Sequence, residues 1–303
     1  MNDLISNSSI HHRYLIANEH DLQWGLTINT IGRQQIKPQE KYPPTDHPIR
    51  YLFSPEKGRL LDEYQLVYIT QGGGYFESSS QKLTEVTAGS MFLLFPNEWH
   101  NYHPNPSSGW EEYWIGFKGP NIDNRIKNGF FSKQKPVFYV GVLDDIVQLY
   151  TEGMKVAQEQ NSGYQQMMAG IVNHLLGIAY SRDKHLSFED MKVANHINRA
   201  KIIFANSFQH NIKPEEVAEQ IHMSYSWFRR LFKEFTGFAP AQYIQELRIQ
   251  HSKELLTNTS FSIKEIAYKS GFDNPEYYCT AFKKRSGMTP LKYRNFTQGK
   301  ISL

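Results

Sequence analysis

Cysteine is almost absent from this chain of 303 residues, which contains Cys279 and no other. One thiol cannot form a disulfide within the chain, and such scarcity is typical of proteins kept in a reducing compartment. Long apolar runs are missing as well, since no stretch approaches the ~20 residues that a membrane-spanning helix requires. Residues 1–21 lack the basic start and apolar core of a secretion signal. We therefore expect a cytoplasmic protein with no membrane partner.

Signatures of catalysis and of metal binding are also lacking. No Ser/His/Asp arrangement or pair of carboxylates stands out, and the histidines nearest to a metal-binding pair are His100 and His103. Their spacing does not follow the alternation that would place both side chains on one face of a strand. The glycines at 72–74 are not followed by the helix and the Lys-Ser/Thr pair of a phosphate-binding loop, so they indicate a turn. We expect no cofactor, no metal and no enzymatic activity.

The net charge of +3 hides an uneven distribution. From Met191 onward there are 17 Lys and Arg against nine Asp and Glu, a net charge of +8. The preceding residues carry 16 against 21, a net charge of −5. A basic segment confined to one part of a chain is typical of a domain that binds nucleic-acid phosphates. The partner predicted for the C-terminal third is double-stranded DNA.

That basic third contains a repeat with an offset of 50 residues. Phe232-Lys233, Gly237, Pro240 and Tyr243 recur as Phe282-Lys283, Gly287, Pro290 and Tyr293. Two copies are too few for a stacked solenoid, which needs about three repeats to bury its faces. The repeat therefore indicates two copies of one small supersecondary unit.

The first copy has the pattern of two short helices joined by a tight turn. Pro214 suits the first turn of a helix, and the break at His222-Met223 is followed by Ser224, a good N-cap. Apolar residues at helical spacing then continue to Gly237, which closes the second helix of this helix-turn-helix pattern. The DNA contacts predicted for its outward face are Ser224, Tyr225, Ser226, Arg229, Arg230 and Lys233. A solvated basic face is the alternative.

The second copy follows the same plan. Gly271 stands where the end of a helix needs positive φ, and Asn274 caps the next helix with Pro275 at its first position. The predicted contacts, which could equally be ordinary surface residues, are Asn274, Glu276, Tyr277, Thr280 and Lys283. Residues 240–256 predict a connecting helix roughly 25 Å long. Successive major grooves on one side of a duplex lie ~34 Å apart, so the two units could enter adjacent turns.

The N-terminal half has the features of β structure. Residues 22–140 contain short β-branched and aromatic runs separated by Gly, Pro and Asn, as in a small β-barrel or jelly roll. Aromatic residues gather in one part of it, at Trp99, Tyr102, Trp110, Tyr113 and Trp114. They could pack the barrel, or they could line a pocket for a small molecule, because apolar sugar faces stack on indole and phenol rings.

Two helical stripes follow the predicted barrel. The positions that carry them are Leu143, Val147, Tyr150, Met154, Met168, Ile171 and Leu175. Such a hairpin can pack on its own barrel, or it can form a coiled-coil-like seam with a second copy. The resulting domains are 1–140 for arm and barrel, 141–181 for the hairpin, 182–190 for a linker and 191–298 for the DNA-binding domain.

The C-terminal residues together resemble the AraC/XylS family of transcription regulators. The similarity is carried by the run from Gly271 to Tyr278, by Phe282-Lys283-Lys284, and by Gly287-Met288-Thr289-Pro290 with Tyr293-Arg294. It implies one domain with two helix-turn-helix units. The base-reading residues that it implies are Ser226, Arg229 and Arg230 in the first unit and Glu276, Tyr277 and Thr280 in the second. Many members carry arginine where Thr280 stands, which weakens the expectation for the second unit.

The segment from Tyr64 to Phe117 resembles the ligand domain of arabinose-responsive members of that family. A tyrosine and a tryptophan that contact the sugar there match Tyr102 and Trp110, whereas an arginine contact falls at Gln71. The resemblance implies a small-molecule effector of carbohydrate type bound at these three positions. It also implies a homodimer formed through the hairpin positions named above, and an N-terminal arm before Trp24 that can cover the pocket. Activation would come from placing the dimer beside RNA polymerase.

The predicted fold is α+β in two parts. A cupin-like β-barrel or jelly roll with a helical hairpin precedes an all-α domain of about seven helices with two helix-turn-helix units. The predicted function is a sequence-specific transcription regulator, an activator, that a sugar-like effector controls. Two alternatives stay open. The chain could be a regulator without a ligand, controlled by a protein partner or by its expression level, or a cupin enzyme with a DNA-binding tail.

Overall fold

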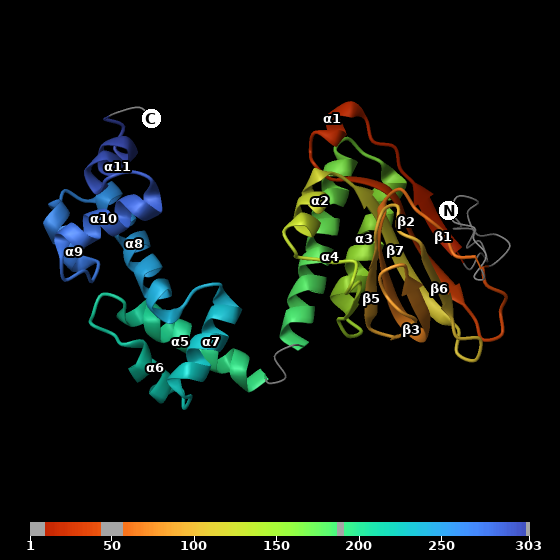
Figure 1. Cartoon of the computed structure of the whole chain (residues 1–303). Helices are drawn as coiled ribbons and strands as arrows, with labels where there is room; N and C mark the ends of the chain where they lie inside the picture. Colours follow the sequence, from red (N-terminus) through yellow and green to blue (C-terminus); the bar gives the residue numbers. More distant parts are fainter. Residues whose placement is uncertain (1–9, 44–56, 187–190, 301–303) are drawn as a thin grey trace, which may run out of the picture. The chain divides into compact units, whose positions relative to one another are not determined.

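The structure, a computed structural model, describes residues 10–43, 57–186 and 191–300, which form two compact units (Figure 1). Unit 1 is Met1–Ser187 and unit 2 is Phe188–Leu303. The boundary falls within the predicted linker, of which residues 182–186 end a helix and residues 187–190 lie outside the described residues. Residues 1–9 of the predicted arm lie outside them too.

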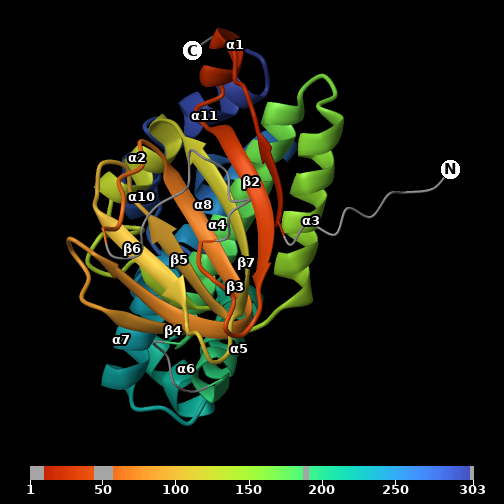
Figure 2. The same ribbon diagram turned by 90° about the vertical axis from the view of Figure 1, so that its right-hand side faces the viewer.

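Unit 1 is built on an antiparallel sheet with eight strands in its described part. The strands are β1 (Ile10–Tyr14), β2 (Thr27–Ile36), β3 (Tyr64–Ser78), β4 (Thr84–Thr87), β5 (Ser90–Leu94), β6 (His100–Pro104), β7 (Trp110–Lys118) and β8 (Val137–Tyr139). Six follow one another in the order β1-β2-β7-β3-β5-β8, while β4 and β6 pair with β3. The first half of the long strand β3 pairs with β5 and β7, and its second half with β4 and β6 (Figure 2). The sheet therefore folds over on itself.

The glycines at 72–74 form part of β3 and do not make a turn. Strand β3 runs through them without a break, and there it exchanges one set of partner strands for the other. Gly72 has a φ of +69°, and a Cβ on it would collide with the backbone carbonyl of Gly109. Because glycine has no Cβ, the strand can bend here and the backbones of neighbouring segments can approach it closely. The prediction of a turn is wrong for this reason.

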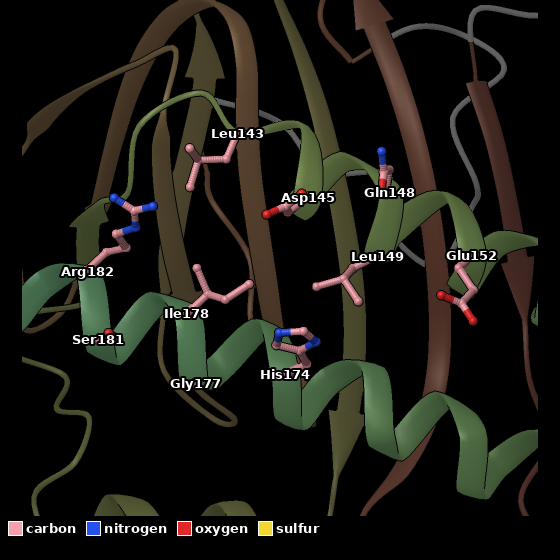
Figure 3. Close-up of a pocket in the computed structure, with 10 residues that line it drawn as sticks. All are labelled: Leu143, Asp145, Gln148, Leu149, Glu152, His174, Gly177, Ile178, Ser181 and Arg182. Carbon is pink, nitrogen blue, oxygen red and sulfur yellow. The ribbon is translucent and has the colours of Figure 1, made fainter.

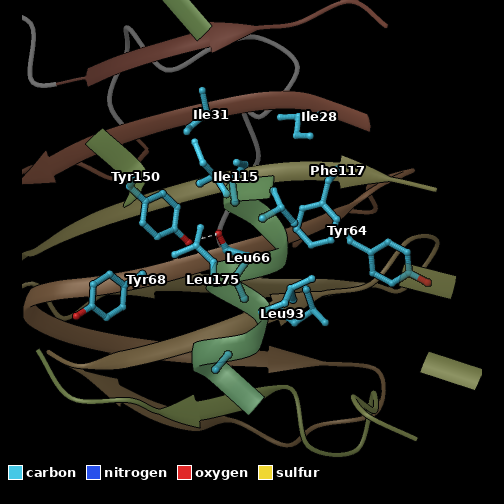
Figure 4. Close-up of a cluster of buried hydrophobic side chains, with 14 of the residues drawn as sticks. Ile28, Ile31, Tyr64, Leu66, Tyr68, Leu93, Ile115, Phe117, Tyr150 and Leu175 are labelled. Carbon is cyan, nitrogen blue, oxygen red and sulfur yellow. Dashed lines mark hydrogen bonds between the residues drawn. The ribbon is translucent and has the colours of Figure 1, made fainter. Parts of the chain in front are cut away.

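Helices α3 (Asp144–Glu159) and α4 (Tyr164–Leu186) cover one face of this sheet (Figure 1). Their buried residues recur at helical spacing, with Ile146 and Tyr150 on α3 and Val172 and Leu175 on α4. The Tyr150 hydroxyl donates a hydrogen bond to the Leu66 carbonyl at 3.1 Å (Figure 4). Two short helices, α1 (Glu19–Leu22) and α2 (Pro120–Lys127), complete the unit. A continuous apolar core thus holds the hairpin to its own sheet.

The opposite face of the sheet is turned inward and carries a second, smaller apolar cluster. Its members are Ile36, Leu61, Val67, Ile69, Phe76, Val86, Phe92, Leu94, Tyr102, Trp110 and Trp114, all of them buried. Alternation along β3 explains the division, because Leu66 and Tyr68 face the helices whereas Val67 and Ile69 face inward. We call this inward-facing side the barrel interior.

Unit 2 consists of seven helices in its described part. They are α5 (Met191–Ser207), α6 (Pro214–Gln220), α7 (Tyr225–Thr236), α8 (Pro240–Asn258), α9 (Ile263–Lys269), α10 (Pro275–Ser286) and α11 (Pro290–Thr297). Each helix-turn-helix pair has its own apolar core, one around Phe204 and Phe232 and the other around Ile266 and Phe282. Helix α8 runs between the halves and contributes to both cores (Figure 1).

Each helix-turn-helix turn places one residue in the left-handed backbone region. That residue is His222 in the first unit (φ +57°) and Gly271 in the second (φ +84°). A Cβ on Gly271 would lie 2.6 Å from the Phe208 carbonyl oxygen, so only glycine fits there without a shift of the backbone. The positive φ predicted for Gly271 is confirmed. The α+β organisation, with a sheet-rich part before a helical domain of seven helices, is confirmed as well.

Candidate DNA interface and effector site

Helix α7 presents a basic surface on the side opposite its core residues. Phe228, Leu231 and Phe232 are buried in unit 2. The exposed predicted contacts are Ser224, Ser226, Arg229, Arg230 and Lys233. Positions 226, 229, 230 and 233 follow the i, i+3, i+4, i+7 spacing that places side chains on one side of a helix. Arginine can bond bidentately to guanine and lysine suits phosphate, so this surface has the chemistry of a recognition helix.

Side-chain contacts in and just before α7 show how its surface is organised. The Arg230 guanidinium lies over the Trp227 ring, 4.4 Å from its centroid, a stacking that restricts the arginine. Burial and the neighbouring Glu215 raise the pKa of the half-buried Tyr225 hydroxyl. Ser224 occupies the N-cap position without a side-chain capping hydrogen bond, so the helix does not use its hydroxyl.

Helix α10 carries the predicted contacts of the second unit, and several of them serve the domain itself. Asn274 Oδ1 accepts hydrogen bonds from the backbone N–H groups of Glu276 (2.8 Å) and Tyr277 (3.0 Å). Gln245 on α8 donates to the Tyr277 hydroxyl at 2.6 Å, and Thr280 donates to the Glu276 carbonyl at 3.1 Å. The exposed residues are Asn274, Glu276, Tyr277, Thr280 and Lys283. Three of these polar side chains are therefore already engaged, that of Tyr277 with α8 and those of Asn274 and Thr280 with the backbone of α10 itself.

Helix α8 holds the two halves of unit 2 together through Arg248. Its Nε donates to the Phe208 carbonyl at 2.7 Å and its Nη2 to the His210 carbonyl at 3.0 Å, both in the loop after α5. The same guanidinium lies 5.9 Å from the ring centroid of Phe272, in the turn of the second unit. The helix between the two units is therefore tied to both of them.

In the barrel interior, side chains from β2, β7 and β3 lie in cross-strand rows. The pairs in register on β2 and β7 are Ile36 with Trp110, Gln34 with Glu112, Gly32 with Trp114 and Thr30 with Gly116. Strand β3 adds Ile69 opposite Glu112, Val67 opposite Trp114 and Gln65 opposite Gly116. Opposed Cβ atoms are about 4.5–5.5 Å apart, and the next row follows ~7 Å along the strand. Rows with an indole therefore alternate with polar rows.

Six buried side chains in these rows have polar atoms without a hydrogen-bond partner among the described residues. The atoms are Thr30 Oγ1, Gln34 Oε1 and Nε2, Gln65 Oε1, Trp110 Nε1, Glu112 Oε2 and Trp114 Nε1. Each of these side chains is at most 5% exposed. Leaving a buried polar group unpaired costs about 1–3 kcal/mol, and native proteins contain few such groups. Their concentration on one interior face is a reason to look for a ligand there.

Arg59 places a positive charge against this interior. Its Nη2 donates to the Tyr102 hydroxyl at 2.5 Å, and its Nε lies 3.2 Å from Nε2 of His100. Burial and this guanidinium lower the pKa of His100 to about 3, so its imidazole is neutral. Burial raises the pKa of Glu112 to about 8, although the charge of Arg59 acts in the opposite direction. The Glu112 carboxyl is therefore mostly protonated at neutral pH.

Two of the three predicted effector residues meet in the interior. Tyr102 and Trp110 have ring centroids 6.1 Å apart, and Tyr42 stands edge-on to Trp110 at the same distance. Tyr42 and Ile36 also line a pocket of about 240 Å³. Gln71, the third residue, is exposed, because an irregularity in the pairing of β3 with β7 precedes it. The structure does not bring Gln71 together with the other two.

Sequence reasoning missed Gln34, Arg59 and Glu112. One signal was present, since Trp110, Glu112 and Trp114 alternate along one strand and therefore share a face. No sequence pattern connects Glu112 with Gln34, because their strands are far apart in the chain and only the register of β2 with β7 pairs them.

The residues predicted for dimerisation fall into two groups. Those buried against their own sheet are Tyr150, Met168, Ile171 and Leu175, and those half-buried are Leu143, Val147 and Met154. The barrel of the same chain thus covers the first group, the arrangement that was the alternative to a dimer seam. The outer side of the hairpin has a groove of about 550 Å³ (Figure 3). Its lining is Leu143, Asp145, Gln148, Leu149, Glu152, His174, Gly177, Ile178, Ser181 and Arg182.

Comparison with protein families assigns both parts of the chain. Residues 27–175 match a family described as AraC-like ligand binding domain, and residues 217–295 match one described as helix-turn-helix domain. The chain belongs to the AraC/XylS family of transcription regulators. The first match spans the barrel interior and most of the hairpin, and the second spans both recognition helices. The family predicted from the C-terminal motifs is confirmed.

Curated relatives of this AraC/XylS-family chain are regulators of bacterial operons. The Msm operon regulatory protein of Streptococcus mutans is 26% identical over 93% of this chain and 98% of its own length. The lactose operon transcription activator of Staphylococcus xylosus is 26% identical over 75% of this chain and 82% of its own. The raffinose operon transcriptional regulatory protein of Pediococcus pentosaceus is 24% identical over 78% of this chain and 86% of its own length. The chain is thus a DNA-binding transcription regulator with a ligand-binding domain.

None of the helices described is long and apolar enough to pass through a membrane. Within the part of the chain that the structure describes, no group of three or more His, Cys, Asp and Glu side chains could hold a metal ion.

Proposed function

We propose that this regulator responds to a sugar bound in the barrel interior. The observation that carries the proposal is the group of buried polar atoms that lack partners among the described residues and lie between indole and phenol rings. Sugar hydroxyls donate and accept hydrogen bonds, while the apolar faces of sugar rings stack on aromatic ones. Relatives named for lactose and raffinose operons support this ligand class. Tyr102 and Trp110 are the contacts retained from the sequence, and the exposed Gln71 is left out.

Calorimetric titration of the full chain with neutral mono-, di- and trisaccharides, lactose and raffinose included, tests this site. We expect one sugar to bind, and Trp110→Phe to weaken its binding by up to about tenfold. Phenylalanine keeps an aromatic face but lacks the buried Nε1 donor, and a hydrogen bond contributes about 0.5–1.5 kcal/mol. Trp99→Phe is the matched control, since Trp99 is half-buried outside the interior cluster and donates to the Lys57 carbonyl. If the folded protein binds no sugar of the panel, a regulator controlled by a protein partner or by its expression level replaces this proposal.

A bound sugar would act by changing the balance between two arrangements of the DNA-binding domains. It can do so only if its affinity differs between them. The arm before Trp24 is one route, because residues 10–14 pair with β2 and Gln166 on α4 donates to Asp21 in the arm at 2.9 Å. Strand β2 also carries Gln34 in the interior. A ligand that contacts Gln34 would therefore act on the strand to which the arm is paired.

We infer that a homodimer forms through the outer groove of the hairpin. Helix α3 contributes Asp145 and Glu152 to its lining, whereas α4 contributes His174 and Arg182 (Figure 3). A two-fold partner that lays its α4 over this α3 would bring opposite charges together. The half-buried residues of the predicted seam, Leu143, Val147 and Met154, would join this contact.

On the DNA side, we propose that α7 reads bases and that α10 mainly positions the protein on the phosphate backbone. The exposed arginines of α7 support the first role, and the engaged polar side chains of α10 support the second. A dimer bound beside a promoter would activate transcription by contacting RNA polymerase. The protein would work in the cytoplasm, because bacterial DNA lies there. Relatives that are transcription regulators support a protein without enzymatic activity.

A further inference from the structure

Glu112 and Gln34 face each other in the barrel interior. They are paired in register on β7 and β2 and are 2% and 0% exposed. Glu112 Oε2 and both polar atoms of Gln34 have no hydrogen-bond partner among the described residues. The rows on either side hold Trp110 and Trp114, and Ile69 lies opposite Glu112 on β3. A carboxyl group and an amide thus share a buried row between two indoles.

The titratable and charged groups that act on Glu112 are Arg59, Tyr42 and Tyr102. Arg59 is engaged elsewhere, since it donates to the Tyr102 hydroxyl at 2.5 Å and approaches His100 at 3.2 Å. Burial raises the pKa of both tyrosines, which therefore stay neutral near pH 7. Burial also holds the pKa of Glu112 at about 8 despite the charge of Arg59. Of the two phenols and the carboxyl, the carboxyl of Glu112 is the one that titrates near neutral pH.

The interior atoms that have no hydrogen-bond partner among the described residues indicate which class of ligand could bind there. Gln34 Nε2, Trp110 Nε1 and Trp114 Nε1 are donors, whereas Glu112 Oε2, Gln34 Oε1 and Gln65 Oε1 include acceptors in every protonation state. A phosphate or a carboxylate would pair with the donors alone and leave acceptors buried, at about 1–3 kcal/mol each. An uncharged polyhydroxyl compound pairs with both kinds, because each hydroxyl donates and accepts.

We propose that ligand hydroxyls bind to the Gln34–Glu112 pair and that Glu112 releases its proton to solvent when they bind. This inference rests on the sugar site proposed above. Hydroxyl donors stabilise a carboxylate, because they supply charge-assisted hydrogen bonds, and Glu112 Oε2 has none from the described residues. The Gln34 amide adds a further donor, and Arg59 supplies a compensating charge. Ligand affinity therefore rises with pH.

The test is calorimetric titration of the full chain with the neutral sugar that the wild-type protein binds most tightly. Titrations between about pH 6 and 9, in buffers of different ionisation enthalpy, measure affinity and proton exchange together. Wild-type affinity should rise by up to about tenfold per pH unit below the pKa of Glu112 and level off above it, with about one proton released per ligand. Glu112→Gln should bind more weakly, without proton release and without the rise.

Glu98→Gln is the matched control. Glu98 is also a buried carboxylate of unit 1, but it pairs with Lys133 at 2.8 Å and accepts a hydrogen bond from Ser78 at 3.1 Å. Burial alone would raise its pKa, yet these partners lower it overall. The Glu98→Gln variant should therefore keep both the pH dependence of binding and the released proton.

A second measurement needs no ligand. The pKa of Glu112 is about 8 in the folded protein and 4.5 as an ordinary glutamate, so between these values the folded state binds more protons than the unfolded state. The contribution of Glu112 to the free energy of unfolding therefore falls as the pH rises through this range. Relative to wild type, Glu112→Gln should gain stability from about pH 5 to pH 8, whereas Glu98→Gln should not.

The outcomes separate this inference from the sugar site. Wild-type affinity that does not change with pH, proton release by the Glu112→Gln variant, or an unfolding difference that does not widen with pH each overturns the role of Glu112. All three leave the sugar site standing. If no sugar in the panel binds to the folded wild-type protein, the site and this inference fall together.

Discussion

Two glycines of unit 2 have almost the same backbone conformation but different surroundings. Gly237 ends α7 with a φ of +78°, and Gly271 lies in the second helix-turn-helix turn with a φ of +84°. A Cβ on Gly237 would meet nothing within 4 Å, whereas one on Gly271 would lie 2.6 Å from the Phe208 carbonyl oxygen. The pair therefore separates the effect of backbone conformation from that of close packing.

Replacing Gly271 by alanine should destabilise the protein more than replacing Gly237. Left-handed backbone costs a residue with a Cβ about 1–2 kcal/mol at either position. At Gly271 the contact with Phe208 adds to this, so we expect a loss of at least ~2 kcal/mol in the free energy of unfolding there. Urea unfolding of the two variants measures the difference. Equal losses would contradict the packing role of Gly271.

At the scale of elements, the two recognition helices share one plan but differ in what their side chains do. Arg229 and Arg230 project from α7 into solvent, while Tyr277 and Thr280 on α10 make hydrogen bonds within the domain. The sequence indicated this inequality, because Thr280 stands where many members of the family carry arginine. The hydrogen bond from Gln245 to Tyr277 was not predictable, because it joins two helices through side chains at no fixed spacing.

Alanine at Arg229 or Arg230 should weaken the specific DNA footprints without unfolding the domain. Each bidentate contact with a base contributes about 1–3 kcal/mol to discrimination, so either change should weaken specific binding roughly 10- to 100-fold. Thr280→Ala should have a smaller effect. Footprinting at one stated salt concentration measures this, with Arg199→Ala on α5 as an exposed arginine outside the recognition helices. Unchanged footprints in the Arg229 and Arg230 variants would refute the assignment of α7.

At the scale of the whole molecule, the two parts of the chain carry opposite net charges. The residues from Met191 onward carry a net charge of +8, and those before it carry −5. Attraction to DNA phosphates is therefore confined to unit 2 and weakens with salt. The acidic unit 1 is left to contact the effector and, in our proposal, a second copy of itself.

Glutamate at Ile178 should separate the proposed dimer into monomers. Ile178 lies in the outer groove between α3 and α4, where glutamate would replace an apolar contact with a charge that must lose its water when the copies meet (Figure 3). Sedimentation equilibrium of the full chain should show a wild-type dimer and an Ile178→Glu monomer. Gln158→Glu adds the same charge at an exposed position of α3 outside the groove and should remain dimeric. A monomeric wild-type protein would rule the dimer out.

The sequence by itself determined the C-terminal domain. Apolar spacing, N-caps and the glycines at 237, 271 and 287 are local signals, and the repeat displays them twice. Helices and tight turns depend on residues close together in the chain, so these signals suffice to predict the two helix pairs and the helix that connects them. The bend of β3 at Gly72 escaped prediction, because the partner strands that require it are distant in sequence.

Only the tertiary structure decided what lies inside the barrel. Gln34 and Glu112 are separate in the chain and become neighbours through the register of β2 with β7. The pKa of Glu112 depends on burial that three strands create together, and no local pattern encodes burial of that kind. What covers the two helical stripes of the hairpin was likewise not predictable from local sequence. Their spacing predicts an apolar face, but whether Tyr150 and Leu175 meet a partner or their own sheet depends on packing across the whole unit.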